Sequence, residues 1–229
     1  MTLHIRQPVI TAEFDRLIED TLLKAPRAQF YRDFGKRSLD VAIVLLGAVP
    51  VVLVTLVLAA LIALDGKSPF FLQKRVGRHG RIFYMWKLRS MVADAESRLE
   101  AHLASDPAAR AEWDRNQKLR NDPRITVVGR IIRKTSLDEL PQLFNVLRGD
   151  MSLVGPRPML VSQQELYPGT AYYALRPGIT GFWQISVRNE SSFAERAGFD
   201  TDYLRQVSLG TDLSVIAKTF RVVLHGTGC

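Results

Sequence analysis

The dominant feature of the hydropathy pattern is an apolar run over residues 41–64, which contains no charged side chain. A single helix of this length would extend about 36 Å at roughly 1.5 Å per residue, and the hydrocarbon core of a bilayer is about 30 Å thick. The run therefore predicts a helix in contact with lipid. A straight transmembrane span is the simplest interpretation.

Pro50 lies near the middle of this run, and basic residues flank the run on both sides. A proline inside a helix removes one backbone hydrogen bond and bends the axis. Lys36 and Arg37 precede the run, and Lys67 follows it. Because basic flanks favour the cytoplasmic side of a membrane, a helix that bends at Pro50 and returns to the same face satisfies both ends. The sequence favours this re-entrant arrangement, with a spanning helix as the alternative.

Shorter periodic segments follow. Residues 82–88 have strand character, and an apolar residue every four positions predicts a helix over residues 90–104. The C-terminal segment 213–224 has an apolar stripe opposite a basic face, which predicts a helix that lies either at the membrane interface or on the protein core. The other predicted elements are helices over 12–23, 106–119, 136–149 and 159–167, a loop over 167–177, and short strands over 151–154 and within 176–184.

These patterns predict an α+β protein in three parts. Residues 1–35 form an N-terminal arm, residues 36–68 a membrane-embedded re-entrant helix hairpin, and residues 69–229 a mostly helical cytosolic, membrane-associated catalytic domain. This domain is expected to contain a few short strands and interfacial amphipathic helices. The arm has no apolar segment of the kind that a cleaved signal peptide requires, so we expect no such peptide.

The composition limits the classes of partner. Lysine and arginine number 31 against 23 for aspartate and glutamate, and the formal charge of +8 favours anionic partners such as phospholipid, nucleotide, phosphosugar or nucleic acid. The one cysteine, Cys229, excludes an intramolecular disulfide. The four histidines are scattered without ligand spacing, so a structural zinc site is not expected.

Candidate chemistry is concentrated in residues 133–158, where two adjacent carboxylates lie between arginines. Ser136 and Glu139 have capping-box spacing, which places Asp138 and Glu139 in the first turn of a helix that ends at Gly149. Pro141 makes this start irregular. The exposed N–H groups of a first turn keep carboxylates ionised, as nucleophilic attack on phosphorus or metal binding requires. The alternative is that both acids only complement the helix dipole.

Four cations are candidates for phosphate contact. Arg157 lies between Pro156 and Pro158, which restrict the backbone on both sides, and its planar guanidinium suits phosphate. Lys87 and Arg89 alternate with apolar residues, so both extend from one face of an extended segment. Arg133 precedes Asp138 by five residues. For each, a solvated surface cation is the alternative.

These residues carry a family resemblance. LDELPQLFN at residues 137–145 and MSLVGPRP at 151–158 resemble the signature of the bacterial sugar transferase family, the monotopic polyprenyl-phosphate phosphoglycosyl transferases. The resemblance is strongest to the undecaprenyl-phosphate galactose phosphotransferases of exopolysaccharide synthesis. It extends over roughly residues 36–224. Its further motifs are KR at 36–37, QKRVG at 73–77, KLRSM at 87–91 and RPGITG at 176–181. The family commonly continues with Gly-Arg-Asn, and Val187 departs from that pattern.

The resemblance implies transfer of a sugar-1-phosphate from a UDP-sugar, galactose or glucose, to undecaprenyl phosphate with release of UMP. It implies Mg²⁺, a location on the cytoplasmic face of the bacterial inner membrane, and the re-entrant helix. Asp138 would be the nucleophile, and Glu139 a metal ligand or proton-handling partner. Lys87, Arg89, Arg133 and Arg157 would bind phosphate, and Lys36, Arg37 and Pro50 would belong to the membrane element.

Two other classes remain as alternatives. A non-catalytic membrane-bound adaptor would use the same basic surface for anionic lipid. A nucleic-acid-binding protein is disfavoured, because the basic residues are dispersed around an uncharged membrane run. A soluble-type nucleotide-binding enzyme is also disfavoured, since the chain has neither a Gly-x-Gly-x-x-Gly turn nor a Walker lysine loop.

Overall fold

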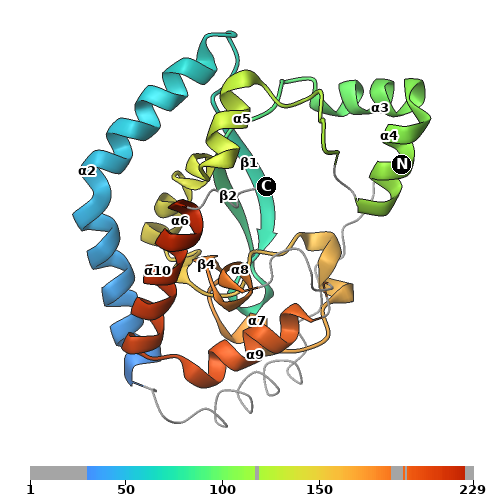
Figure 1. Ribbon diagram of the computed structural model, residues 1–229. Helices are drawn as coiled ribbons and strands as arrows, with labels where there is room; N and C mark the ends of the chain where they lie inside the picture. Colours follow the sequence, from blue (N-terminus) through green and yellow to red (C-terminus); the bar gives the residue numbers. More distant parts are fainter. Residues whose placement is uncertain (1–29, 117–118, 187–192, 194, 225–229) are drawn as a thin grey trace.

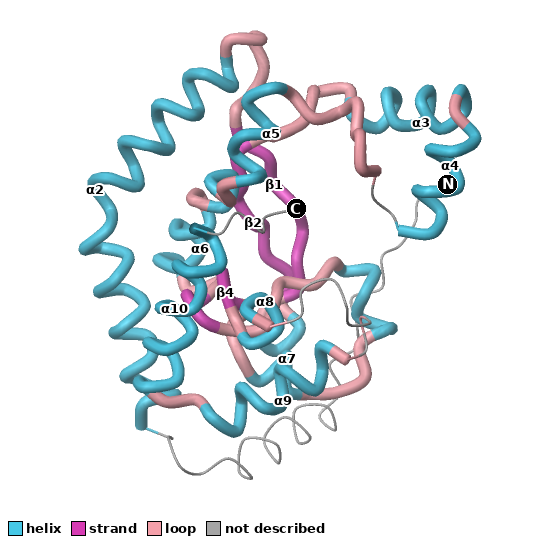
Figure 2. The backbone as a smooth tube through the Cα atoms, in the orientation of Figure 1, coloured by secondary structure: helices cyan, strands magenta, loops and turns pink. Residues whose placement is uncertain are grey.

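The computed structural model describes residues 30–116, 119–186, 193 and 195–224. The predicted helix over 12–23 and the departure at Val187 lie outside these residues. Figures 1 and 2 show two small sheets surrounded by helices, so the predicted mixture of helices with a few short strands is confirmed. The described helices are α2 Lys36–Ala63, α3 Ala95–Ser105, α4 Pro107–Asn116, α5 Val127–Lys134, α6 Gln142–Arg148, α7 Ala171–Ala174, α8 Phe182–Ile185, α9 Arg196–Gln206 and α10 Leu209–Leu224.

The sheets are both two-stranded. β1 Phe70–Val76 and β2 Ile82–Leu88 form an antiparallel hairpin in which Phe71 pairs with Lys87. β3 Ser152–Val154 and β4 Gly178–Thr180 pair in parallel. The two predicted strand segments within residues 151–154 and 176–184 are therefore neighbours, although about two dozen residues separate them in sequence.

α2 is one continuous helix with Pro50 inside it, and Figure 1 shows that it curves along its length. Its buried side chains lie only near its two ends, at Lys36, Asp40, Val44, Ala59 and Ile62. The side chains between Val44 and Ala59 are exposed or partly exposed. Both ends of α2 therefore pack on the folded domain, while its apolar middle does not.

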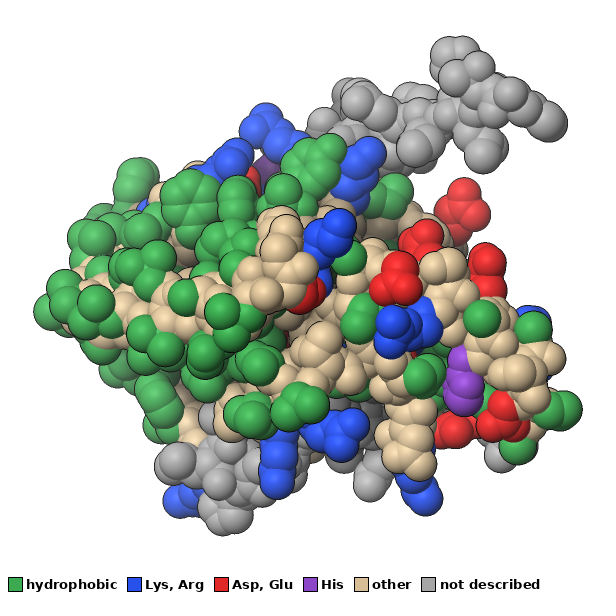
Figure 3. Space-filling model, turned by 90° about the horizontal axis from the view of Figure 1, so that it is seen from above, with side chains coloured by type: hydrophobic (Ala, Val, Ile, Leu, Met, Phe, Trp, Pro, Cys, Tyr) green, Lys and Arg blue, Asp and Glu red, His purple; other side chains and the backbone are tan. Residues whose placement is uncertain are grey.

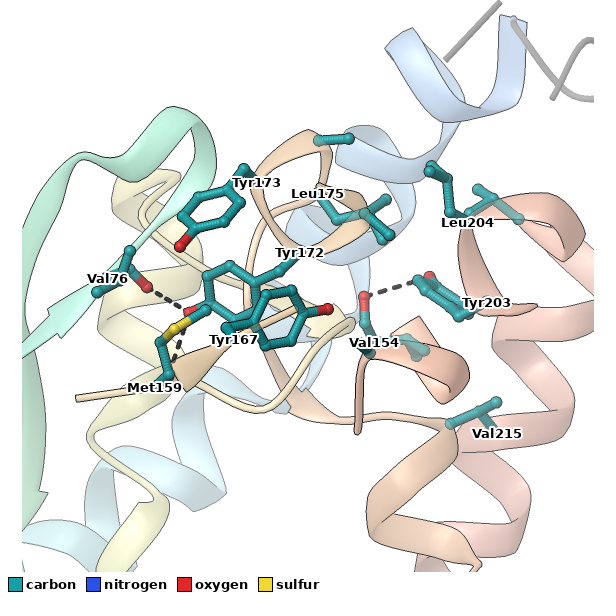
Figure 4. Packing of buried hydrophobic residues seen from close by; sticks show 14 residues of the cluster. Val76, Val154, Met159, Tyr167, Tyr172, Tyr173, Leu175, Tyr203, Leu204 and Val215 are labelled. Atoms are coloured by element: carbon teal, nitrogen blue, oxygen red, sulfur yellow. Dashed lines mark hydrogen bonds between the residues drawn. The ribbon is translucent and has the colours of Figure 1, made fainter. Parts of the chain in front are cut away.

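The largest hydrophobic cluster contains four buried tyrosines (Figure 4). The Tyr172 hydroxyl donates to the Val76 carbonyl at 2.5 Å and accepts from the Met159 backbone N–H at 3.2 Å. Since buried polar groups need partners, this hydroxyl fixes the end of β1 against the segment that follows Pro158.

Close backbone contacts join the GPRP and RPGITG segments. The Gly155 N–H donates to the Thr180 carbonyl, and the Gly178 N–H donates to the Pro156 carbonyl, each at 2.8 Å. A Cβ on Gly178 would lie 2.1 Å from Gly155 N, and a Cβ on Gly181 would lie 2.1 Å from Gly155 O. Only glycine, which has no Cβ, lets the two backbone segments approach this closely. Their contact fixes the turn that carries Arg157.

Several predicted boundaries change. The segment predicted as a helix over 159–167 is a 3₁₀ turn, Val161–Leu166, and the strand predicted within 176–184 ends at Thr180 and is followed by α8. The loop predicted over 167–177 contains α7, whose four residues are all buried. β1, α5 and α9 were not predicted: β1 and α9 have no strict period in sequence, and α5 has only eight residues.

Candidate active site

The acidic pair lies on a short irregular turn. Leu137–Glu139 forms a 3₁₀ turn, and α6 begins only after Pro141. Ser136 has a φ of 56° and makes no capping hydrogen bond through its side chain, so the predicted capping box and the helix start at Ser136 are wrong. Pro141 explains the break, because it cannot donate the backbone hydrogen bond that a continuous helix needs. The predicted end at Gly149 is confirmed, with a φ of 84°.

Lys87 of β2 connects both acids. Its Nζ donates to Glu139 Oε1 at 2.8 Å and to Asp138 Oδ2 at 3.5 Å. The side chains are partly enclosed, with exposed fractions of 21% for Lys87, 13% for Asp138 and 27% for Glu139. The prediction that these residues belong to one site agrees with this geometry, although their individual chemical roles stay predictions.

Asp138 is the more buried of the two acids. Burial raises the pKa of its carboxyl above the usual range, the Lys87 ammonium opposes this shift, the Glu139 carboxylate adds to it, and Arg133 lowers it again. Partial loss of water makes a carboxylate a stronger nucleophile, and a nearby cation favours its ionised form. The site can therefore prepare Asp138 for attack, provided that the carboxyl is ionised.

A cavity of about 910 Å³ opens above the pair. Its volume falls in the range of small-molecule and cofactor sites. The six predicted site residues all line it: Lys87, Arg89, Arg133, Asp138, Glu139 and Arg157. Arg124, Asp94 and Glu96 line the same cavity, so its described lining contains five cations and four carboxylates, a small excess of positive charge that suits an anionic ligand.

Arg89 has additional partners. Its guanidinium donates to Asp65 Oδ2 at 2.8 Å and Oδ1 at 2.6 Å, and its Nε donates to the Ser68 carbonyl at 2.7 Å. The bonds from Arg89 lower the pKa of the Asp65 carboxyl to about 2. Arg89 therefore fixes the exit of α2 to the end of β2, and its contact with a substrate phosphate stays a prediction.

Arg157 is exposed at the cavity wall, and its guanidinium lies 5.5 Å from the centroid of the Trp183 ring. Arg75 holds the same turn from behind, since its Nη1 donates to the Pro158 carbonyl at 2.9 Å. The sequence contained the QKRVG motif without a role for it. The structure shows that its arginine supports the Arg157 turn.

The residues predicted for the membrane element are also structural. Lys36 is buried and donates to Asp212 Oδ2 of α10 at 2.7 Å, and Arg37 donates to the Leu147 carbonyl at the end of α6 at 2.7 Å. Asp40 accepts from the Ser152 hydroxyl at 2.7 Å. These contacts join the base of α2 to α10, α6 and β3. Sequence reasoning missed Asp212 and Asp40, because no local pattern indicates which distant cation or hydroxyl they meet.

The carboxylates at this cavity suit a hard cation such as Mg²⁺ only when a bound substrate also supplies oxygen ligands. Within the described residues, no group of three or more His, Cys, Asp or Glu side chains could hold a metal ion. Asp138 and Glu139 do provide two carboxylates at the cavity wall. Since Mg²⁺ is usually bound by one or two carboxylates plus substrate phosphate oxygens, the pair fits Mg²⁺ in that mode.

Comparison with known proteins identifies the class. The family model described as bacterial sugar transferase matches residues 31–226, and the chain therefore belongs to this family. It is 49% identical over 203 residues to the UDP-galactose-lipid carrier transferase of Erwinia amylovora, which covers 85% of this chain and 41% of that protein. It is 52% identical over 166 residues to the undecaprenyl-phosphate galactose phosphotransferase of Salmonella typhimurium. This match covers 72% of this chain and 35% of that protein. The chain thus spans well under half of these two relatives.

A relative of similar length also matches. The exopolysaccharide production protein ExoY of Sinorhizobium fredii is 44% identical over 197 residues, which are 85% of this chain and 87% of that protein. The matched region contains α2 and the whole candidate site, from Lys87 to Arg157. The predicted family is therefore confirmed.

Proposed function

We propose that this protein transfers a sugar-1-phosphate from a UDP-sugar to undecaprenyl phosphate and releases UMP, as the first membrane step of exopolysaccharide or related glycoconjugate synthesis. The observation that carries the proposal is the Asp138–Glu139 pair, bonded to Lys87 and exposed to a cavity that Arg133 and Arg157 also line. The names of the Erwinia and Salmonella relatives, a UDP-galactose-lipid carrier transferase and an undecaprenyl-phosphate galactose phosphotransferase, support the same reaction class.

In the first half-reaction, an Asp138 carboxylate oxygen forms a bond to the sugar-bearing phosphorus, and the bond from that phosphorus to the UMP oxygen breaks. In the second, an oxygen of the polyprenyl phosphate attacks the same phosphorus and releases the Asp138 carboxylate. Lys87 and Arg133 balance the phosphoryl charge next to Asp138, and Arg157 binds the diphosphate from the GPRP turn. Mg²⁺ bound by Glu139 and phosphate oxygens would supply further charge neutralisation.

The membrane element is proposed to be re-entrant. Within the part of the chain that the structure describes, one helix, Tyr31–Ala63, is long and apolar enough to cross a membrane. Its first turns bond to α10 and β3 through Lys36 and Asp40, and its exit bonds to Arg89. Since both ends are attached to the same domain, a straight span would require that domain to reach both faces of the bilayer. A curved helix whose apolar middle enters one leaflet avoids this requirement.

Further apolar side chains support docking on a membrane surface. In Figure 3, hydrophobic side chains cover the side of the molecule formed by α2. Exposed apolar residues also occur on three other helices: Val127 and Ile131 of α5, Phe144 and Leu147 of α6, and Leu213 and Phe220 of α10. Such side chains favour the boundary between headgroups and acyl chains. We place the protein on the cytoplasmic face of the inner membrane, where a soluble UDP-sugar and a lipid acceptor meet.

The direct test measures UMP. Purified protein receives undecaprenyl phosphate, Mg²⁺ and one UDP-sugar at a time, and UMP release is expected with UDP-galactose or UDP-glucose. A relative from Aeromonas hydrophila is named for transfer of N-acetylgalactosamine phosphate, so UDP-N-acetylgalactosamine is included. A membrane-bound adaptor, the alternative class, would release no UMP with any of them.

A further inference from the structure

Behind the Arg157 turn lies a stack of charged and aromatic side chains from three elements. The Arg196 guanidinium of α9 lies 4.1 Å from the centroid of the Trp183 ring of α8, and the Arg157 guanidinium lies 5.5 Å from the same ring. Arg196 also lies 5.0 Å from the Phe193 ring. Cation–π contacts at these distances are attractive, and they become stronger when water is excluded.

The members of the stack differ in their access to the cavity. Arg157 is exposed and lines the large cavity, and Trp183 lines it with an exposed fraction of 7%. Arg196 does not line this cavity. Its Nε is buried and has no hydrogen-bond partner in the described part of the chain. Arg196 therefore acts on the cavity through Trp183 rather than by direct contact.

The stack belongs to a cluster of like charges. Burial lowers the pKa of the Arg196 guanidinium, the neighbouring Arg157 lowers it further, and Asp200, one helical turn away on α9, opposes both effects. Burial also lowers the pKa of Arg75 to about 10, with Arg157 as the second cause. Three guanidinium groups thus repel one another around the GPRP turn, and an anion at Arg157 would relieve that repulsion.

Asp200, the acid beside Arg196, provides little compensation for these positive charges. Asp200 is buried and accepts from the Tyr167 hydroxyl at 2.7 Å. Burial raises the pKa of its carboxyl to about 7. Its negative charge near neutral pH is therefore partial, and the cluster stays positive toward the cavity.

We propose that Trp183 and Arg196 are positioning residues, which hold the Arg157 guanidinium at the cavity wall for contact with the diphosphate of the nucleotide substrate. The inference rests on the proposed function and adds two residues to it. A flexible arginine loses side-chain entropy when it binds, and a stacked guanidinium has already lost part of it. Substrate binding is therefore tighter than an unstacked arginine would give.

The test is a double-mutant cycle on uridine diphosphate binding, measured by calorimetry on the full chain in detergent. Arg196→Met keeps an unbranched apolar stem against Trp183 and removes the cation. It should weaken binding roughly 3- to 30-fold, the range that one cation–π contact provides. In an Arg157→Ala background the same change should have almost no further effect, because residues that act through each other are not additive.

Control variants distinguish a positioning role of Arg196 from a general effect on the stability of the protein. Arg205→Met removes an exposed cation from the other end of α9 and should bind uridine diphosphate as wild type does. Arg196→Lys should restore part of the affinity, and the melting temperature of each variant is recorded. Trp183→Phe keeps a smaller aromatic ring. It should lower the affinity for uridine diphosphate in a chain that retains Arg157, but not in the Arg157→Ala variant.

Additive effects of Arg157→Ala and Arg196→Met would overturn the inference, as would a wild-type chain that does not bind uridine diphosphate. Failure of the proposed function has a different signature, which is tight binding of uridine diphosphate without UMP release from any UDP-sugar. The two failures are therefore distinguishable.

Discussion

Lys87 Nζ lies 2.8 Å from Glu139 Oε1 and donates a hydrogen bond to it, while the same ammonium lies 3.5 Å from Asp138 Oδ2. One cation thus serves two carboxylates that follow each other in sequence. Burial raises the pKa of the Asp138 carboxyl, the Lys87 ammonium opposes this shift, and the Glu139 carboxylate adds to it. The chemistry of the pair therefore depends on pH.

The first prediction concerns that pH dependence. Asp138 is nucleophilic only as the anion, so covalent labelling by a radiolabelled UDP-sugar should fall as pH decreases through its raised pKa. Lys87 lowers this pKa, and Lys87→Met should therefore move the acid limb to higher pH. The midpoint of labelling is measured between about pH 5 and 9. Lys134→Met, at an exposed position of α5, should leave the midpoint unchanged.

The second prediction assigns the nucleophile. Asp138→Asn preserves shape but cannot attack, so label that survives denaturation should disappear. Glu139→Gln should weaken metal binding or proton handling and still form some intermediate slowly. In wild type, polyprenyl phosphate added before denaturation should transfer the label to lipid. Persistent label in Asp138→Asn would place the nucleophile elsewhere, and Glu139 would be examined next.

The third prediction concerns topology. Asp33 precedes α2 and Lys67 follows it, and both residues are exposed. Single cysteines at these positions, with Cys229 replaced, should both resist an impermeant thiol reagent applied outside intact spheroplasts. Labelling of one position alone would contradict the re-entrant helix. Pro50→Ala should straighten α2 and lower activity, because straightening separates its two attachment points.

The fourth prediction concerns the base of α2. Asp212 is buried and accepts from Lys36, Tyr31 and Tyr203, each at 2.7 Å. Removal of one partner from a buried ion pair costs about 3–5 kcal/mol. Lys36→Met should therefore lower the melting temperature strongly in detergent. Lys218→Met, at an exposed position of α10, should not, and equal melting temperatures for the two variants would refute the buried pair.

The fifth prediction tests the close backbone contact behind Arg157. Gly181→Ala places a Cβ 2.1 Å from the Gly155 carbonyl oxygen, so the GPRP turn must move. We expect a loss of about 1–3 kcal/mol of stability, which is typical of overpacking, together with weaker nucleotide binding. Gly210→Ala meets nothing within 4 Å and serves as the control. A Gly181→Ala variant with wild-type stability and binding would contradict the contact.

The sequence alone determined the features that depend on local chemistry. The apolar run with Pro50, the strand at residues 82–88 and the helix end at Gly149 follow from hydropathy period and backbone freedom, and the structure contains all three. The acidic pair and its surrounding cations were also recognisable, because the residue types that bind phosphate are few and the motif places them in a fixed order.

Only the tertiary structure decided which distant groups meet. Asp65 pairs with Arg89 and Asp212 with Lys36, and α9 places Arg196 on Trp183. No periodicity encodes such partners, since they depend on how elements far apart in sequence pack. The turn at Ser136 was missed for a related reason. Its positive φ is unfavourable for a serine considered alone, and the Leu137–Glu139 turn that follows it packs against α5 and β2, which no local pattern predicts.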